Sequence, residues 1–275
     1  MSLDQFAPLL FLGAIFAGTI GTLTGMGGGV VLIPMLVLGF GVDLRYAAGT
    51  SLIAVIATSC GAALKRRQNL SNLHVGVFLE IAAVAGAVGG ALVARDISKA
   101  VLEGLLGITL VGSALLALRA PDVAAMAPRG GDLLELAGAF DDQGMHVEYA
   151  PRRIPAGLAL MGVAGLMSGL LGIGSGALKT LAMDLVMRLP LKVSTATSNF
   201  MIGITAGASA AIYFRQGFID PVLVGPVTLG TLGGAVLGAW MLPHLSTRWL
   251  RPFFAVVVGF LGIEILWEAW RAWHG

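Results

Sequence analysis

The sequence predicts an all-α polytopic membrane protein built from two inverted repeats, and three observations lead to this prediction. Hydrophobic residues make up 57% of the 275 residues and charged residues only 12%, about half the charged share of a soluble domain. No Asp, Glu, Lys or Arg occurs in 5–42, 154–178, 193–214 or 221–247. About 20 apolar residues are enough for a helix to cross a hydrocarbon core of about 30 Å. The third observation is an internal repeat.

The repeat appears when the chain is shifted by 147 residues. This shift places the glycine-rich block 25–29 (Gly-Met-Gly-Gly-Gly) on 172–176 (Gly-Ile-Gly-Ser-Gly), and it places the Thr-Ser pair at 50–51 on the Thr-Ser pair at 197–198. We therefore expect a first membrane repeat over 1–119, a connector over 120–153 and a second membrane repeat over 154–275.

The first half is predicted to contain five segments. Segment 6–24 is an uncharged apolar helix that runs into the glycine-rich block. Segment 29–41 holds only about 12 apolar residues and would rise about 18 Å as a helix, which is too short to cross comfortably. We expect segments 6–24 and 29–41 to form a hairpin with its glycine tip inside the membrane, where protein or a water-filled cavity surrounds irregular backbone. Three fuller helices follow at 46–64, 74–94 and 99–118.

The second half is predicted to repeat this order. Its segments are expected at 155–171, 177–188, 193–214, 221–241 and 250–270. The glycine cluster 86–90 of the first half matches 230–234 of the second, and glycines at such spacing let helices approach closely in lipid.

Counting crossings predicts the topology. A hairpin returns to its starting side and three crossings lead to the other side, so the second half is inverted relative to the first. The loops then hold 11 Lys and Arg residues on one face and 5 on the other. The positive-inside rule places the first face, with the connector 120–153, in the cytoplasm and both termini in the periplasm.

The connector holds six of the fifteen acidic residues. Two short alternating runs, 134–140 and 145–149, flank a turn and favour a β-hairpin. The connector would either gate access from the cytoplasm or act as a plain solvated linker.

Several function classes are disfavoured by the composition. Cys60 is the single cysteine, and the four histidines show no ligand spacing, so we expect no metal site and no cofactor. The net charge of +2 gives no reason to expect a nucleic-acid partner. No residue pattern pairs a nucleophile with a base, so we expect no enzyme. The expected partners are membrane lipid and a small anionic substrate, and the oligomeric state stays open.

The two glycine-rich breaks are the strongest candidates for a binding site. Glycine lets a ligand touch the backbone, and the start of the short helix after each break has free N–H groups that bind anions. Two inverted copies would converge near the membrane midplane, as in many secondary transporters. A helix-packing role is the alternative. The candidate residues are Gly27, Gly28, Gly29, Gly174, Ser175 and Gly176.

Lys179 is the most distinctive single residue, because it lies within an uncharged stretch of the short helix. A membrane-embedded charge usually faces a partner or a cavity, so we expect Lys179 to attract an anionic substrate. Its repeat equivalent is Leu32, so the two halves differ chemically. Alternatively, Lys179 extends to the interface or pairs with Asp184.

Hydroxyl and amide groups begin the third segment of each half and would donate hydrogen bonds to an oxyanion, or else cap or join helices. These residues are Thr50, Ser51, Thr197, Ser198 and Asn199. Three membrane-segment acids would relay protons or lie at a headgroup boundary. They are Glu80, Glu103 and Glu264.

The paired glycine blocks, each followed by a Thr-Ser element, resemble the sulfite exporter TauE/SafE family over nearly the whole chain. This resemblance implies a permease of the bacterial inner membrane for sulfite or organosulfonates, with export as the expected direction. Ser175 replaces a glycine of the motif and Leu181 stands where the first block has Pro34, so the two sites are expected to differ. The alternatives are an anion-selective channel and a permease for a non-sulfur organic anion.

Overall fold

The computed structural model describes residues 3–24, 27–63, 71–119, 136–142, 145–241 and 247–274. The first half contains α1 (Leu3–Thr24), α2 (Gly29–Pro34), the π-helical turn η1 (Met35–Gly39), α3 (Leu44–Ala63), α4 (Leu73–Val93) and α5 (Lys99–Arg119). The second half contains α6 (Ile154–Leu171), α7 (Gly176–Leu181), the π-helical turn η2 (Ala182–Val186), α8 (Leu191–Arg215), α9 (Pro221–Met241) and α10 (Thr247–His274). These helices match the predicted segments, and each predicted short segment is an α-helix continued by a π-helical turn.

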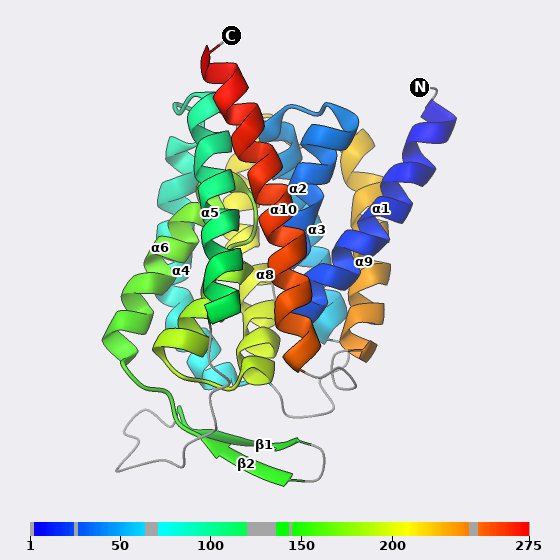
Figure 1. The fold of residues 1–275 in the computed structure, drawn as a ribbon. Coiled ribbons are helices and arrows are strands. Elements are labelled where there is room, and N and C mark those ends of the chain that lie inside the picture. The colour runs from blue at the N-terminus through cyan, green and yellow to red at the C-terminus, as the bar shows by residue number, and fades with distance from the viewer. Residues whose placement is uncertain are drawn as a thin grey trace.

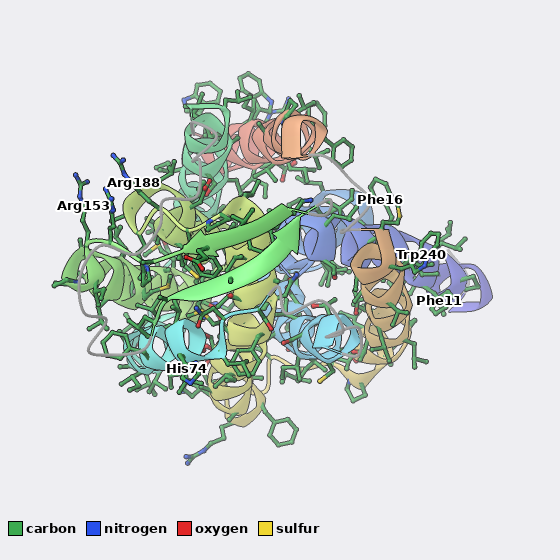
Figure 2. The ribbon with its side chains drawn as sticks, turned by 90° about the horizontal axis from the view of Figure 1, so that it is seen from below. Phe11, Phe16, His74, Arg153, Arg188 and Trp240 are labelled. Atoms are coloured by element: carbon green, nitrogen blue, oxygen red, sulfur yellow. The ribbon has the colours of Figure 1, made fainter. Side chains whose placement is uncertain are left out.

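The bundle has the surface of a membrane protein. Four of its described helices are long and apolar enough to cross a membrane, namely α1, α4, α6 and α9. Large apolar side chains lie exposed on its sides, including Phe16 at 59%, Ile81 at 72% and Phe214 at 71%. Figure 2 shows Phe11, Phe16 and Trp240 pointing away from the bundle. Lipid solvates such a surface and water does not, so the predicted all-α membrane class is confirmed.

Helices from the two halves pack against each other in pairs. α1 packs mainly on α9 and α6 mainly on α4, while α5 packs on α10 (Figure 1). α3 and α8 contact each other, and they also contact α9 and α4 respectively. Since α3 and α8 have neighbours on several sides, the Ser and Thr side chains of both helices are buried.

Glycines let two of these pairs approach closely. A Cβ placed on Gly86 would collide with the carbonyl oxygen of Gly162, and a Cβ placed on Gly234 would collide with that of Ile15. Ile15 and Gly162 are related by the shift of 147 residues. The packing therefore matches Gly86 to Gly234, one helical turn away from the sequence match to Gly230.

Each glycine-rich break forms the tip of a hairpin. The rings of Phe6, near the start of α1, and Phe40, after η1, meet edge to face with centroids 5.4 Å apart. The backbone N–H of Arg152, just before α6, donates to the carbonyl of Met187, after η2, at 2.9 Å. In both halves the chain therefore returns after the break to the end where its first helix began. The two hairpins start from opposite ends of the bundle (Figure 1).

The connector contains the predicted β-hairpin. β1 (Gly138–Asp142) pairs antiparallel with β2 (Met145–Tyr149), with Phe140 opposite Val147. Leu136, Phe140 and Tyr149 are at most 5% exposed, because they pack into an apolar cluster that includes Leu79 of α4. The alternative of a plain solvated linker is therefore wrong for residues 136–142 and 145–149, while 120–135 and 143–144 lie outside the described residues.

The β-hairpin covers one end of the bundle. Seen from that end, it lies across the helices, with His74, Arg153 and Arg188 around it (Figure 2). α1 begins and α10 ends at the opposite end (Figure 1). Asn72 fixes the hairpin to the bundle, because its Nδ2 donates to Leu136 O at 2.8 Å and to the Tyr149 hydroxyl at 3.3 Å.

Candidate functional site

The two positions that precede the short helix have similar backbone conformations in both breaks. Gly27 and Gly174 both have φ of 71°, while Gly28 has φ of 80° and Ser175 has φ of 50°. A left-handed conformation is strained for serine, at about 1–3 kcal/mol, but not for glycine. The second break thus keeps its shape despite the loss of a glycine, which indicates that the surrounding structure imposes that shape.

The two breaks lie against each other in the interior. A Cβ placed on Gly29 would lie 2.6 Å from Ser51 Oγ of α3 and 3.0 Å from the carbonyl oxygen of Ile173 in the other break. Val55 of α3 adjoins both breaks, since a Cβ on Gly27 or on Gly174 would lie within 3.2 Å of its Cγ1. We call Gly27–Gly29, Ile173–Gly176 and the adjacent Ser51 and Ser198 the glycine-break site.

Three hydroxyls at or near this site lack hydrogen-bond partners among the described residues. Thr50 and Ser51 of α3 and Ser175 of the second break are fully buried, and none of their side-chain oxygens has a partner. Burying a hydroxyl without a hydrogen bond costs about 1–3 kcal/mol. In native structures an ordered water, an ion or a ligand often satisfies such a group, so these three hydroxyls are candidates for ligand contact.

The equivalent side chains of α8 are engaged in helix contacts. Ser198 Oγ donates to Gly176 O at 3.2 Å, and Thr197 Oγ1 accepts from the backbone N–H of Asn72 at 3.0 Å. Asn199 Nδ2 donates to Thr22 O at the end of α1, at 3.0 Å. These α8 residues fix the breaks and helix ends around the site. The hydroxyl groups of Thr50 and Ser51 on α3, in contrast, have no hydrogen-bond acceptor among the described residues.

Lys179 of α7 is completely buried and is paired with Glu80 of α4. Its Nζ lies 3.0 Å from Glu80 Oε2, and it also donates to the hydroxyl of Thr205 in α8. The Thr205 hydroxyl in turn donates to Glu80 Oε1. Lys179 therefore does not extend to the interface. The acid that the structure places on its ammonium group is Glu80, while Asp184 lies buried five residues further along the chain.

The other two membrane-segment acids are placed differently. Glu103 forms an ion pair with Lys99, one turn away on α5, at 3.5 Å. Glu264 is exposed on α10. Of the three acids named from the sequence, Glu80 is thus the one in contact with a candidate site residue.

Sequence reasoning missed three residues that organise this region. Thr205 was not singled out, nor was its equivalent Thr58 under the shift of 147 residues, whose hydroxyl donates to Gly27 O at 2.8 Å. Asn72 was also missed, although it links α4, α8 and the β-hairpin. The shift of 147 residues was an available signal, because it pairs Thr58 with Thr205 just as it pairs the two Thr-Ser elements.

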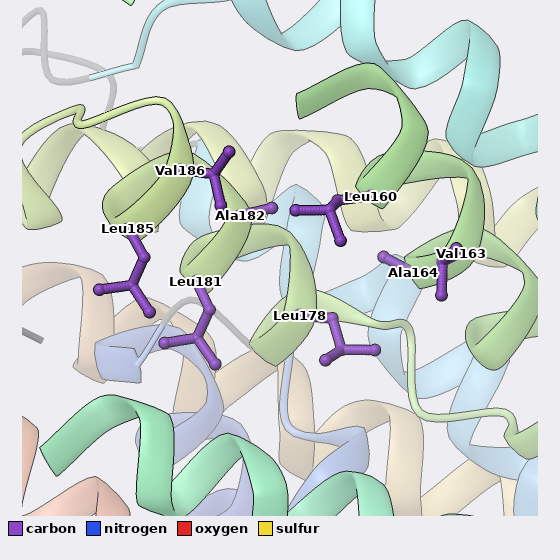
Figure 3. Close-up of a pocket in the computed structure, with 8 residues that line it drawn as sticks. All are labelled: Leu160, Val163, Ala164, Leu178, Leu181, Ala182, Leu185 and Val186. Carbon is purple, nitrogen blue, oxygen red and sulfur yellow. The ribbon is translucent and has the colours of Figure 1, made fainter. Parts of the chain in front are cut away.

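An apolar cavity of about 190 Å³ lies beside the second break, between α6 and the α7–η2 segment (Figure 3). All of its lining side chains are aliphatic, and Leu178 and Leu181 flank Lys179 in sequence. This lining suits an apolar group and offers no donor to an anion. Within the described ranges, no three His, Cys, Asp or Glu side chains lie close enough together to hold a metal ion.

The apolar outer surface and the buried polar site between two broken helices define a polytopic membrane protein of the transporter type. The sequence profile of the sulfite exporter TauE/SafE family matches residues 10–265, so the chain belongs to this family of membrane transporters. The predicted family is confirmed, and it points to a transporter rather than an enzyme.

Curated relatives extend over nearly the whole chain. The chain is 28% identical over 273 residues to the "Probable membrane transporter protein YunE" of Bacillus subtilis, covering 96% of this chain and 98% of that protein. It is 29% identical to the "Probable membrane transporter protein YdhB" of the same organism, covering 84% and 86%. It is 25% identical to the "Probable membrane transporter protein MJ0441" of Methanocaldococcus jannaschii, covering 94% and 95%. No solved structure matched the chain.

Proposed function

We propose that this chain is a secondary transporter that moves a small sulfur-containing anion, sulfite or an organosulfonate, across the bacterial inner membrane by alternating access. The expected direction is export. The observation that carries the proposal is the contact between the two breaks, at which Gly29 adjoins Ile173 and the unpartnered hydroxyl of Ser51. Family membership supports the transport activity, and the buried donors support an anion as the substrate.

The proposed halves, 1–119 and 154–275, are inverted repeats. Support comes from their reciprocal packing, since α1 lies on α9 and α6 lies on α4. It also comes from the two hairpins, which start at opposite ends of the bundle (Figure 1). The β-hairpin end carries Arg152, Arg153 and Arg188, so the positive-inside rule assigns this end and the connector to the cytoplasm and both termini to the periplasm.

The proposed anion ligands come from both halves. The backbone N–H groups that begin α2 and α7, at Gly29 and Gly176, and the hydroxyls of Thr50 and Ser51 would donate hydrogen bonds to the substrate oxygens. Lys179 would supply the positive charge. Sulfite and sulfonates present three oxygens around one sulfur, so they can accept from several donors at once.

Flux measurements in proteoliposomes test this proposal. Sulfite, sulfoacetate, methanesulfonate, lactate and chloride would be supplied separately to vesicles of purified protein. Saturable uptake of sulfite or a sulfonate is expected. Unsaturable conductance would indicate a channel, saturable uptake of lactate alone would indicate a permease for non-sulfur anions, and no flux at all would refute the proposal.

A matched pair of serine variants tests the site. Ser51→Ala removes a hydroxyl that has no partner in the protein, so anion affinity should fall about tenfold while stability is retained. Ser113→Ala on α5 removes a hydroxyl that donates to Thr109 O at 2.7 Å, and it should leave anion affinity unchanged. Equal affinities for the two variants would remove Ser51 from the binding site.

A further inference from the structure

A buried charge pair lies in the interior of the bundle, and a hydroxyl bridges it. Lys179 is 0% exposed and Glu80 is 4% exposed. Their ion pair closes a triangle with Thr205, which accepts from the ammonium group and donates to the carboxylate. The three groups come from α7, α4 and α8, so the triangle joins the second break to helices of both halves.

The other half keeps the same helix arrangement without these charges. The repeat equivalent of Lys179 is Leu32, and the helix register that matches Gly86 to Gly234 matches Glu80 to Thr228. The equivalent positions of α2 and α9 are therefore a leucine and a threonine, where α7 and α4 have the lysine and the glutamate. Replacing a buried ion pair by neutral groups is often neutral or stabilising. The Lys179–Glu80 pair is thus not required by the architecture, which favours a functional reason for it.

The pair lies close to the glycine-break site along α8. Ser198 contacts Gly176 at the start of α7, and Thr205 contacts Lys179 three residues later in α7. Ser198 and Thr205 are seven residues apart, which is two turns on one face of α8 and about 10 Å along its axis. A lysine side chain that leaves Glu80 would therefore turn along α8 toward the glycine-break site.

Few other charges can influence Glu80. α6, which packs on α4, contains no Asp, Glu, Lys, Arg or His over its length, and α8 carries its charges, Lys192 and Arg215, at its two ends. On α4 itself, His74 lies near the β-hairpin end (Figure 2). The α7–η2 segment also carries Asp184, which is buried five residues after Lys179, and Lys179 is the charged group that forms an ion pair with Glu80.

We infer that Glu80 is a proton-binding site that couples proton movement to anion movement, an inference that rests on the proposed function. In the empty carrier, Lys179 is neutralised by the Glu80 carboxylate. A proton from water converts that carboxylate to the neutral acid, and the freed ammonium group then pairs with the entering anion. On release, the anion departs, the acid gives its proton back to water and the ion pair forms again.

This cycle keeps the site neutral in both states. The empty site contains one ammonium and one carboxylate, while the loaded site contains one ammonium, one monoanion and a neutral acid. A charge left uncompensated in a membrane interior is expensive, so two neutral states lower the barrier to alternation. The concentration gradient of the anion would drive outward transport, and one proton would leave with each monoanion.

Proton movement can be measured together with anion flux. Proteoliposomes containing a pH-sensitive dye are given an inward gradient of methanesulfonate, a monoanion that does not titrate near neutral pH, or of sulfite. The wild-type protein should acidify the vesicle interior as the anion enters. The Glu80→Gln variant should abolish this acidification. Vesicles with the Glu264→Gln variant, which changes an exposed acid of α10, should acidify as those with wild-type protein do.

Binding gives a second measurement, which does not depend on the folding of a variant. The dissociation constant of wild-type protein for methanesulfonate should rise up to tenfold per pH unit above the pH at which Glu80 ionises, because proton and anion binding are linked. Calorimetry in buffers of different ionisation heat should show uptake of one proton per anion.

The two proposals fail in different ways. Absence of flux for every anion refutes the proposed function. Flux or binding in wild-type protein without proton uptake refutes the coupling role of Glu80 and leaves the transporter proposal standing.

Discussion

Neutralising one member of the buried ion pair should destabilise the protein far more than neutralising both. Lys179→Met keeps the length of the side chain but leaves Glu80 with no cation at 3.0 Å. The Glu80 side chain is 5% exposed, so water cannot take over the role of Lys179. Removing one partner of such a pair is expected to cost about 3–5 kcal/mol. Glu80→Gln should cost a similar amount, because it leaves the ammonium of Lys179 without its counterion.

The double variant Lys179→Met with Glu80→Gln should return to within about 1 kcal/mol of the wild-type free energy of unfolding, because no buried charge remains. If the two sites were independent, their costs would add to about 6–10 kcal/mol. The double-mutant cycle should therefore give a coupling energy of about 5 kcal/mol or more.

The assay is equilibrium unfolding in mixed micelles, with sodium dodecyl sulfate as the denaturant and circular dichroism as the probe. Glu264→Gln is the control, because Glu264 is exposed on α10. Removal of a charge from an exposed side chain should cost less than about 1 kcal/mol. A Lys179→Met variant as stable as Glu264→Gln, or additive costs in the cycle, would refute the buried ion pair.

Three further predictions concern the break, the connector and the topology. Gly29→Ala should abolish anion binding, since its Cβ would lie 2.6 Å from a site hydroxyl, whereas Gly39→Ala, with nothing within 4 Å, should bind like the wild type in a thermal-shift titration. Asn72→Ala should lower the free energy of unfolding by about 2–3 kcal/mol and speed proteolysis of the β-hairpin, because it removes the α4 cap and two hydrogen bonds to the connector; an unchanged digestion rate would contradict that anchoring role. A single cysteine at Glu148, with Cys60→Ser, should be labelled by an impermeant thiol reagent from the cytoplasmic side of the membrane, and periplasmic labelling would overturn the proposed topology.

The helices and breaks were predictable because they depend on local signals. Charge-free stretches set the spans, and the recurrence of 25–29 at 172–176 set the break positions. The glycine match was displaced by one turn because glycines recur about every four residues in α4 and α9, so that neighbouring turns look alike in sequence. Only the contacts with Gly162 and Ile15 distinguish them.

The partner of Lys179 was not predictable from sequence spacing. Glu80 lies 99 residues away, and the two meet only because α7 folds back beside α4 and α8. Asp184 was the nearest acid along the chain and therefore the natural expectation. The same limit applies to the connector, since its alternating pattern predicted strands but gave no sign that Phe140 and Tyr149 would be buried against the bundle.

The chemical differences between the two halves suit the proposal of a single shared anion. In the first half, the hydroxyls of Thr50 and Ser51 lack protein partners, and position 32 is a leucine. In the second half, the equivalent hydroxyls serve helix contacts, and the position equivalent to Leu32 is Lys179. The first repeat thus offers two neutral hydroxyl donors, while the second offers the charge together with the hydroxyl of Ser175. Two identical repeats would place either two buried ammonium groups or none around one substrate, and both would be poor for a monoanion. Divergence of the repeats is therefore what the proposed mechanism requires, because one anion needs one compensating charge.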